Sequence, residues 1–171
     1  MTKTKREANA TIKEPSSNSP DSDSQGKCSY SVAVRTSCQS TSEEAGVVFI
    51  QLIDKHGEES DKNRLRYSLT HRIKFKAGHS DLFVLADQVH LDHLSKLKLW
   101  LQKYKKDEAW KLHSIMVIKH AESEHILYRF PYDKWIGLNT DSATVIEVCL
   151  DVIGDPWPVL HEEDFSTETY D

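Results

Sequence analysis

The sequence predicts an all-β fold, either a sandwich or a barrel, and three observations lead to this expectation. About eight short runs of residues show the apolar–polar alternation of half-buried strands. The runs recur at fairly regular spacing, and turn-forming pairs such as His56-Gly57 and Ala77-Gly78 separate some of them. The 171 residues are enough for one domain, and no stretch approaches the roughly 20 apolar residues that a membrane-spanning helix needs.

The first two expected strands differ in character. Within residues 29–35, Tyr30, Val32 and Val34 fall on one face, as in a strand with one buried side. Residues 47–54 are apolar on both faces, as in a buried central strand. The remaining expected strands are residues 65–69, 73–75, 82–86, 111–119, 125–130 and 145–152. The last strand ends before Pro156 and Pro158, because proline cannot extend a hydrogen-bonded ladder.

Residues 89–104 fit two different structures. Leu94, Leu97 and Leu101 would share one face of a helix, whereas Leu97, Leu99 and Leu101 would share one face of a strand. The pattern alone does not decide between them.

Composition divides the chain into a body and two tails. Residues 1–27 are rich in Lys, Glu, Ser, Asn and Pro and have almost no large apolar side chains, which predicts a disordered N-terminal tail. The β-rich body is expected over residues 28–152. Residues 153–171 are expected to form an acidic C-terminal tail, because residues 141–171 hold nine acidic residues and no Lys or Arg.

The cysteines and the N-terminus predict a cytoplasmic protein. Cys28, Cys38 and Cys149 are an odd number at wide spacing, which is typical of reduced thiols rather than of a disulfide framework. They also lack the spacing of a structural zinc site. The N-terminus has no apolar segment of the secretory type.

The order of several landmarks resembles one known family. Tyr30-Ser31-Val32-Ala33-Val34 gives an alternating first strand, and Ala45-Gly46 precedes the second. Further landmarks are residues 75–85, 94–100, 110–117 and 128–136. Together they resemble the PLAT domain, also called LH2, of lipoxygenases, polycystins and pancreatic lipases. The resemblance covers residues 28 to about 138. It implies an eight-stranded antiparallel β-sandwich and makes residues 94–101 a strand.

The resemblance also bears on calcium. Many PLAT domains bind calcium through acids after the Ala-Gly turn and through a His-Asp-Asn cluster after the leucine-rich strand. Here Val47-Val48 and Leu101-Gln102-Lys103 stand at these places. Calcium needs six to eight oxygen ligands, and nearby ammonium groups oppose it. We therefore expect no cofactor and no metal site. The alternative is a shifted calcium site made by Glu43, Glu44, Asp107 and Glu108.

The remaining motifs do not indicate an enzyme. The pairs His90 with His93 and His120 with His125 are interpreted as solvated loop histidines, and Ser, His and acidic residues show no spacing typical of a catalytic triad. No phosphate loop or nucleophile elbow is present. We expect no catalysis and no small-molecule substrate. The aromatic residues expected in the core are Phe75, Trp110 and Trp135.

Two basic clusters are candidates for binding a partner. The first contains Lys62, Arg64 and Arg66 and continues to residues 72–76, and the second lies at residues 103–111. A basic surface suits an acidic protein or an anionic lipid. The formal net charge of −5 argues against nucleic acid. The residues predicted to contact a partner or lipid are Arg64, Arg66, Lys103, Tyr104, Lys105 and Lys106. Trp157, between two prolines, either packs on the body or serves as a docking motif.

The predicted function is that of a non-catalytic interaction module of the PLAT type, docking onto a protein partner and able to do so at a membrane surface. Two alternatives stay open. One is a peripheral membrane targeting domain that depends on calcium or anionic lipid. The other is a regulatory fragment of a lipoxygenase-like enzyme.

Overall fold

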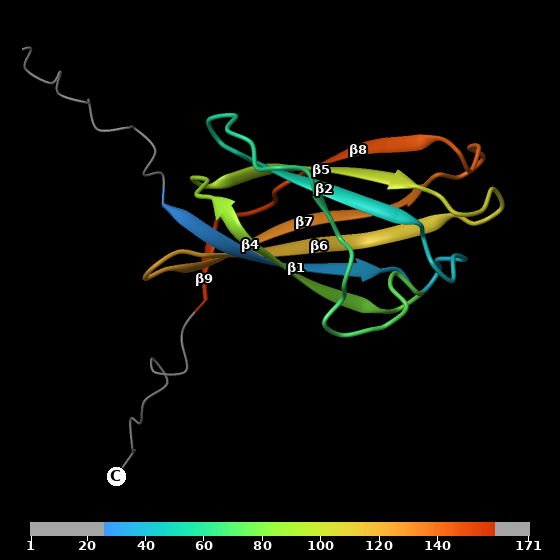
Figure 1. Cartoon of the computed structure of the whole chain (residues 1–171), viewed down its shortest axis with the longest axis horizontal. Helices are drawn as coiled ribbons and strands as arrows, with labels where there is room; N and C mark the ends of the chain where they lie inside the picture. The colour runs from blue at the N-terminus through green and yellow to red at the C-terminus, as the bar shows by residue number, and fades with distance from the viewer. Residues whose placement is uncertain (1–25, 160–171) are drawn as a thin grey trace, which may run out of the picture.

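The computed structural model describes residues 26–159, and these residues form a β-sandwich (Figure 1). They contain strands and connecting loops but no helix. The strands are β1 (Lys27–Thr36), β2 (Val47–Asp54), β3 (Asn63–Arg64), β4 (Ser80–Val89), β5 (Leu94–Gln102), β6 (Trp110–His120), β7 (His125–Ile136), β8 (Val145–Asp151) and β9 (Trp157–Pro158). The predictions for residues 1–25 and 160–171 lie outside the described residues.

The strands form two antiparallel sheets that pack face to face. One sheet has the order β4-β1-β6-β7-β9, and the other has the order β3-β2-β5-β8. All pairs between these strands are antiparallel. The predicted all-β antiparallel sandwich is therefore confirmed. The described part has nine strands rather than eight: seven strands of at least seven residues, and the two short edge strands β3 and β9 of two residues each.

The core lies between the two sheets and follows the alternation in the sequence. Tyr30, Val32 and Val34 of β1 are completely buried. From the other sheet, Leu97, Leu99 and Leu101 of β5 are buried in the same way. Each such aliphatic side chain contributes roughly 1.5–3 kcal/mol through its burial. Since β5 pairs with β2 on one side and β8 on the other, residues 94–101 form a strand, as the resemblance implied.

The aromatic core prediction is correct for two residues and wrong for the third. Phe75 and Trp110 are buried, with ring centroids 5.2 Å apart. Trp135 is 36% exposed. It lies opposite Lys111 in the β6–β7 ladder, while its neighbour Ile136 lies opposite the buried Trp110. Successive residues of a strand point to opposite faces, so Ile136 takes the inward position and Trp135 the outward one.

The strands expected at residues 65–69 and 73–75 are absent, and that prediction was wrong. After β3 the chain runs irregularly to residue 79 and bridges the edge strand of one sheet to the edge strand of the other (Figure 1). Leu65 and Phe75 are buried at this edge. Phe75 has a backbone φ of 61°, outside the β region, which is incompatible with a continuous strand.

The end of the sandwich where β1, β5 and β7 finish is built from long loops. Gly46 shows how closely they approach one another, because a Cβ atom there would overlap the carbonyl oxygen of Gln102. Its φ of 133° is also unfavourable for other residues. Glycine is therefore required at position 46, where the β1–β2 loop crosses the end of β5.

The chain remains part of the sandwich beyond residue 152. Trp157 and Pro158 form β9 and pair with Leu127 and Ile126 of β7. This pairing falls in the segment that the sequence assigned to the acidic tail. The Trp157 side chain itself is 61% exposed. None of the described residues belongs to a helix that could span a bilayer.

Candidate docking surface

The most strongly charged part of the described chain is residues 62–76, which we call the basic strap. It contains six Lys or Arg residues and no Asp or Glu. None of these six cations forms an ion pair with any residue between 26 and 159. Four of them are exposed and two are half-buried. The six cations are Lys62, Arg64, Arg66, Arg72, Lys74 and Lys76.

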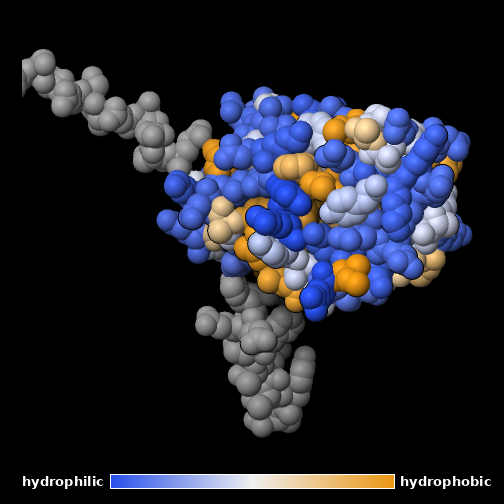
Figure 2. All heavy atoms as spheres, turned by 45° about the vertical axis from the view of Figure 1, so that its right-hand side comes forward, coloured by the Kyte–Doolittle hydropathy of each residue, from blue (hydrophilic) through white to orange (hydrophobic). Residues whose placement is uncertain are grey.

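The basic strap also exposes large apolar side chains. Tyr67 is 74% exposed and Leu69 is 67% exposed, and Ile73 is exposed as well. The guanidinium of Arg66 lies 5.2 Å from the centroid of the Tyr67 ring, a cation–π contact. Figure 2 shows hydrophobic patches beside strongly hydrophilic residues on the face it displays. An exposed surface that combines uncompensated cations with aromatic and aliphatic groups is a candidate binding surface.

A buried carboxylate holds the strap in place. Asp81, the second residue of β4, is completely buried. It accepts hydrogen bonds from Ser68 Oγ at 2.9 Å and from the Phe75 backbone N–H at 2.8 Å, and it lies 3.2 Å from His71 Nδ1. The His71 ring stacks on His79 with ring centroids 4.0 Å apart. These contacts fix the conformation of the strap although it belongs to neither sheet beyond Arg64.

The lysines of the second predicted cluster, at residues 103–111, do not form one exposed basic surface. Lys103 is only 5% exposed, and its ammonium donates to the carbonyl oxygens of Lys106 and Gly137, both at 2.7 Å. Lys105 forms an ion pair with Glu108 at 3.3 Å. Lys106 remains exposed. Lys103 therefore serves the loops internally and does not face solvent beside Lys106.

A shallow pocket of about 180 Å³ joins the strap to the neighbouring loops. It gathers three of the four residues predicted as a shifted calcium site, because Glu43, Glu44 and Glu108 all line it. Lys76, Lys105, Tyr104 and Ile73 line it too. Asp107 lies in the wall of a different hollow. Across residues 26–159, no group of three or more His, Cys, Asp or Glu side chains is placed to hold a metal ion.

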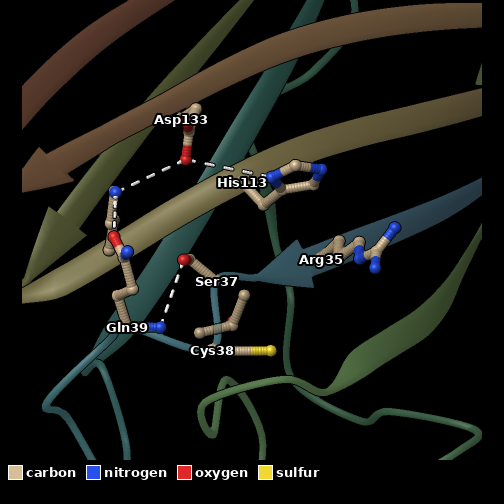
Figure 3. Close-up of a pocket in the computed structure, with 8 residues that line it drawn as sticks. Arg35, Ser37, Cys38, Gln39, His113 and Asp133 are labelled. Atoms are coloured by element: carbon tan, nitrogen blue, oxygen red, sulfur yellow. Dashed lines mark hydrogen bonds and ion pairs between the residues drawn. The ribbon is translucent and has the colours of Figure 1, made fainter.

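A second hollow, of about 320 Å³, lies at the end of β1 beside β6 and β7 (Figure 3). Asp133 lies 3.6 Å from the Lys111 ammonium and 3.9 Å from His113 Nδ1. Figure 3 shows the Cys38 sulfur apart from the His113–Asp133 pair. Thiol, imidazole and carboxylate are thus present without the contacts that would activate the thiol.

Sequence reasoning missed a chain of hydrogen bonds between β1, β6 and β7. Ser31 Oγ lies 2.7 Å from His120 Nε2, and His120 Nδ1 lies 2.6 Å from His125 Nδ1. The two histidines, interpreted from sequence as solvated loop residues, are half-buried and end the strands of a hairpin. Only the strand register reveals the contact with Ser31, because Ser31 and His120 are 89 residues apart in the chain.

Ser31, His120 and His125 are connected in the way that a nucleophile, a base and an orienting group are connected. The rest of a catalytic site is not found around Ser31 in the described part of the chain. Ser31 is in the inner strand β1, and its neighbours across the ladders are Val84 and Ile118. The backbone of an inner strand is occupied by ladder hydrogen bonds on both sides. The amides around Ser31 are therefore not available to stabilise an oxyanion.

At the opposite end of the sandwich, the carboxylates of Asp54 and Asp92 take part in a network of hydrogen bonds and ion pairs. Burial works against ionisation of Asp54, but the backbone N–H groups of His56, Asp92 and Glu58 hold its pKa below the usual value. The Lys55 ammonium, 3.0 Å from Asp92, is the main cause of a lowered pKa at that carboxyl. These groups tie the end of β2 to the β4–β5 connection and do not adjoin the strap.

Comparison with known proteins gives one family match. The family model described as ATS3, embryo-specific protein 3, matches residues 15–140 of this chain. No curated protein matches it.

Solved structures of lipoxygenases share the fold. A calcium-dependent 11R-lipoxygenase matches 73% of this chain with a TM-score of 0.56 and 19% identity. Coral 8R-lipoxygenase, described as activated by calcium through a C2-like domain, matches 72% with a TM-score of 0.57 and 17% identity. A lipoxygenase variant, Delta413-417:GS LOX, matches 73% with a TM-score of 0.57 and 16% identity.

The chain spans only 16% or 17% of the length of these lipoxygenases. At such low identity the likeness establishes the fold alone. It confirms the resemblance to the PLAT domain of lipoxygenases as a resemblance of fold.

Proposed function

The chain belongs to the embryo-specific protein 3 (ATS3) family, and we propose that it is a non-catalytic docking module that binds an acidic surface of a protein partner through the basic strap. One observation carries this proposal. Six cations in fifteen residues have no ion-pair partner between residues 26 and 159, and they surround exposed Tyr67, Leu69 and Ile73.

The composition of the strap suits a protein interface. Arg and Tyr are enriched among the residues that dominate binding energy at interfaces. Arg64 and Arg66 project from the strap, and Arg66 lies over the exposed Tyr67 ring. An acidic partner would neutralise the cations while the aromatic and aliphatic side chains become buried. We place this interaction in the cytoplasm.

A second candidate function is binding to an anionic membrane surface. The exposed aliphatic groups Leu69 and Ile73 favour it, because they could enter the interfacial region of a bilayer while neighbouring cations contact lipid headgroups. Two of the structural relatives are described as regulated by calcium. In this chain the pocket acids lie among Lys76 and Lys105. We therefore propose that docking to either surface needs no calcium.

We also propose that the module has no catalytic activity of its own. The part of each lipoxygenase that shares its fold is a small fraction of that enzyme. Ser31, which contacts His120, lies on the inner strand β1, where ladder hydrogen bonds occupy the backbone amides that would have to stabilise an oxyanion.

The test compares two charge-reversal variants of the full chain. The first is Arg64→Glu with Arg66→Glu in the strap. The matched control is Arg129→Glu with Lys134→Glu, two exposed residues of β7 in the other sheet. Each variant and the wild type are used as bait for proteins, with polyglutamate as competitor. All three are also sedimented with neutral and phosphatidylserine-containing vesicles, with calcium and with chelator.

The proposal predicts captured partners that disappear with the strap variant and with polyglutamate but persist with the control variant. A different result is that the wild type and the control variant sediment with anionic vesicles in chelator while the strap variant does not. That result would identify the membrane, and not a protein, as the ligand of the strap. Sedimentation that requires calcium would contradict both forms of the proposal. Equal binding by both variants would show that the strap is not the docking surface.

A further inference from the structure

His120 and His125 are placed as a pair by the last rung of the β6–β7 ladder. The two residues are directly opposite each other in the register, so their side chains project on the same side of the hairpin. Their Nδ1 atoms are 2.6 Å apart, and the ring planes are inclined at 62°. Two imidazole nitrogens thus converge on one point at the sheet surface.

Ser31 fixes the orientation of one of these rings. Its Oγ lies 2.7 Å from Nε2 of His120. When that Nε2–H donates to the hydroxyl oxygen, the lone pair of His120 is on Nδ1 and faces His125. A histidine that binds a metal through one nitrogen usually has its other nitrogen held by such a polar group.

From this geometry we propose that His120 and His125 bind a divalent transition-metal ion such as Zn²⁺ or Ni²⁺ through their Nδ1 atoms. Imidazole is a good ligand for both ions. Bonds of about 2.0–2.1 Å at a tetrahedral ion would place the two nitrogens about 3.3 Å apart. The rings would have to separate by roughly 0.7 Å, a movement that small side-chain rotations at the end of a hairpin can supply. The ion takes the place of the proton between the two nitrogens. That proton leaves Nδ1 of His125 and a proton is taken up at Nε2 of the same ring, so each imidazole stays neutral and each Nδ1 presents its lone pair to the ion.

The surroundings allow an ion to enter and to complete its coordination. Both histidines are half-buried, and His120 lines an open hollow with Lys27, Asp87 and Glu122. Residues 26–159 contain no group of three or more ligand side chains placed for a metal, so the proposal assigns two ligands to the pair and leaves the other positions of the ion to ligands from outside the pair. Such a site binds more weakly than a four-ligand structural zinc site.

The bound ion would fasten together the two strands of the hairpin on which β9 depends. The Val159 backbone N–H donates to the His125 carbonyl oxygen at 2.7 Å, next to the pairing of β9 with β7. Stiffening His125 therefore stiffens the attachment of the last described strand. This site is separate from the basic strap, so its existence does not depend on the docking proposal.

The test is titration of the full chain with ZnCl₂ and with NiCl₂, followed by calorimetry and by NMR. We expect one ion per chain and an affinity lower by roughly ten-fold or more in His120→Ala and in His125→Ala. The matched control His90→Ala removes an exposed histidine and should bind as the wild type does. Ser31→Ala should also weaken binding, because the ring it orients is freed.

Two results would overturn the proposal. One is wild-type affinity in His125→Ala, and the other is equal loss of affinity in His90→Ala. Thermal unfolding in chelator checks that each variant folds. If a histidine variant does not fold, the test rests on the NMR signals of the wild type that shift when the metal is added. These shifting signals must belong to His120, His125 and their hairpin, and metal-induced shifts centred elsewhere would contradict the site.

Discussion

Replacing Asp81 by alanine tests whether a single carboxylate organises the docking surface. Asp81 is fully buried in β4, and its carboxylate contacts Ser68, His71 and the backbone N–H of Phe75. All three partners belong to the basic strap. The substitution leaves both sheets intact and removes the acceptor that holds the strap against them.

The expected loss of stability follows from these contacts. Hydrogen bonds to a charged group contribute about 1.5–3 kcal/mol each, so three of them amount to at least about 4.5 kcal/mol. When the strap opens, the freed donors regain hydrogen bonds to water. The variant also no longer buries a carboxylate. We therefore expect the free energy of unfolding to fall by about 2–4 kcal/mol.

Urea unfolding measures this loss, and amide hydrogen exchange locates it. The Phe75 amide should exchange much faster in Asp81→Ala, while the Val117 amide in the inner strand β6 should change only with global stability. Asp151→Ala is the control, because that exposed carboxylate pairs with Lys96 at a distance of 3.9 Å and should contribute less than about 1 kcal/mol. A loss below about 1 kcal/mol for Asp81→Ala, or exchange that rises equally in the strap and in β6, would refute the reasoning.

Three further predictions concern the loops and titrating groups. Gly46→Ala should lower the free energy of unfolding by more than about 2 kcal/mol in urea unfolding, since the new Cβ meets the Gln102 carbonyl; an unchanged midpoint would contradict this. The lowered pKa of Asp54 stabilises the fold above the unfolded-state pKa of about 3.9, and this stability is lost as pH falls through the folded-state pKa. Asp54→Asn should therefore lower stability at neutral pH and flatten the acid limb of a stability–pH profile; an acid limb as steep as in the wild type would count against this. Burial raises the pKa of Tyr128 to about 12, so its stabilising effect is present below about pH 10 and is lost as pH rises through 12. Tyrosine ionisation is followed by absorbance at 295 nm in the wild type and in Tyr128→Phe. The wild type should ionise one more tyrosine than the variant, and this difference should appear only above about pH 11 or on unfolding. If the additional tyrosine of the wild type titrated near pH 10, the prediction would be wrong.

The strands that could be predicted are those in which alternation coincides with burial. In β1 the residues Tyr30, Val32 and Val34 are apolar and point inward, so pattern and structure agree. Alternation failed in the strap, where Tyr67 and Leu69 alternate with polar residues yet both face solvent. The reason is that hydrogen bonds to Asp81 fix the backbone there, and this partner is more than ten residues away along the chain. Periodicity carries no information about such a contact.

The same limit applies to the site residues. The charge of the strap could be read from sequence, because six cations without an acid form a local feature. The predicted group of Glu43, Glu44 and Glu108 does meet in one pocket, but Lys76 and Lys105 from other segments enter it too. The His120–His125 pair was visible as a spacing of five residues. Its meaning depended on the hairpin register and on Ser31, which only the structure supplies.

Lys103 connects these observations with the proposed independence from calcium. A bound cation at the loop end would neutralise carbonyl and carboxylate oxygens of adjacent loops. Here a buried ammonium that belongs to the chain meets the carbonyl oxygens of Lys106 and Gly137 and so links the β5–β6 and β7–β8 loops. Because that positive charge is permanently attached, we propose that these loops are held together without a bound ion. The module can then present Lys106 and the basic strap in one arrangement whatever the calcium concentration, which is what constitutive docking to an acidic partner requires.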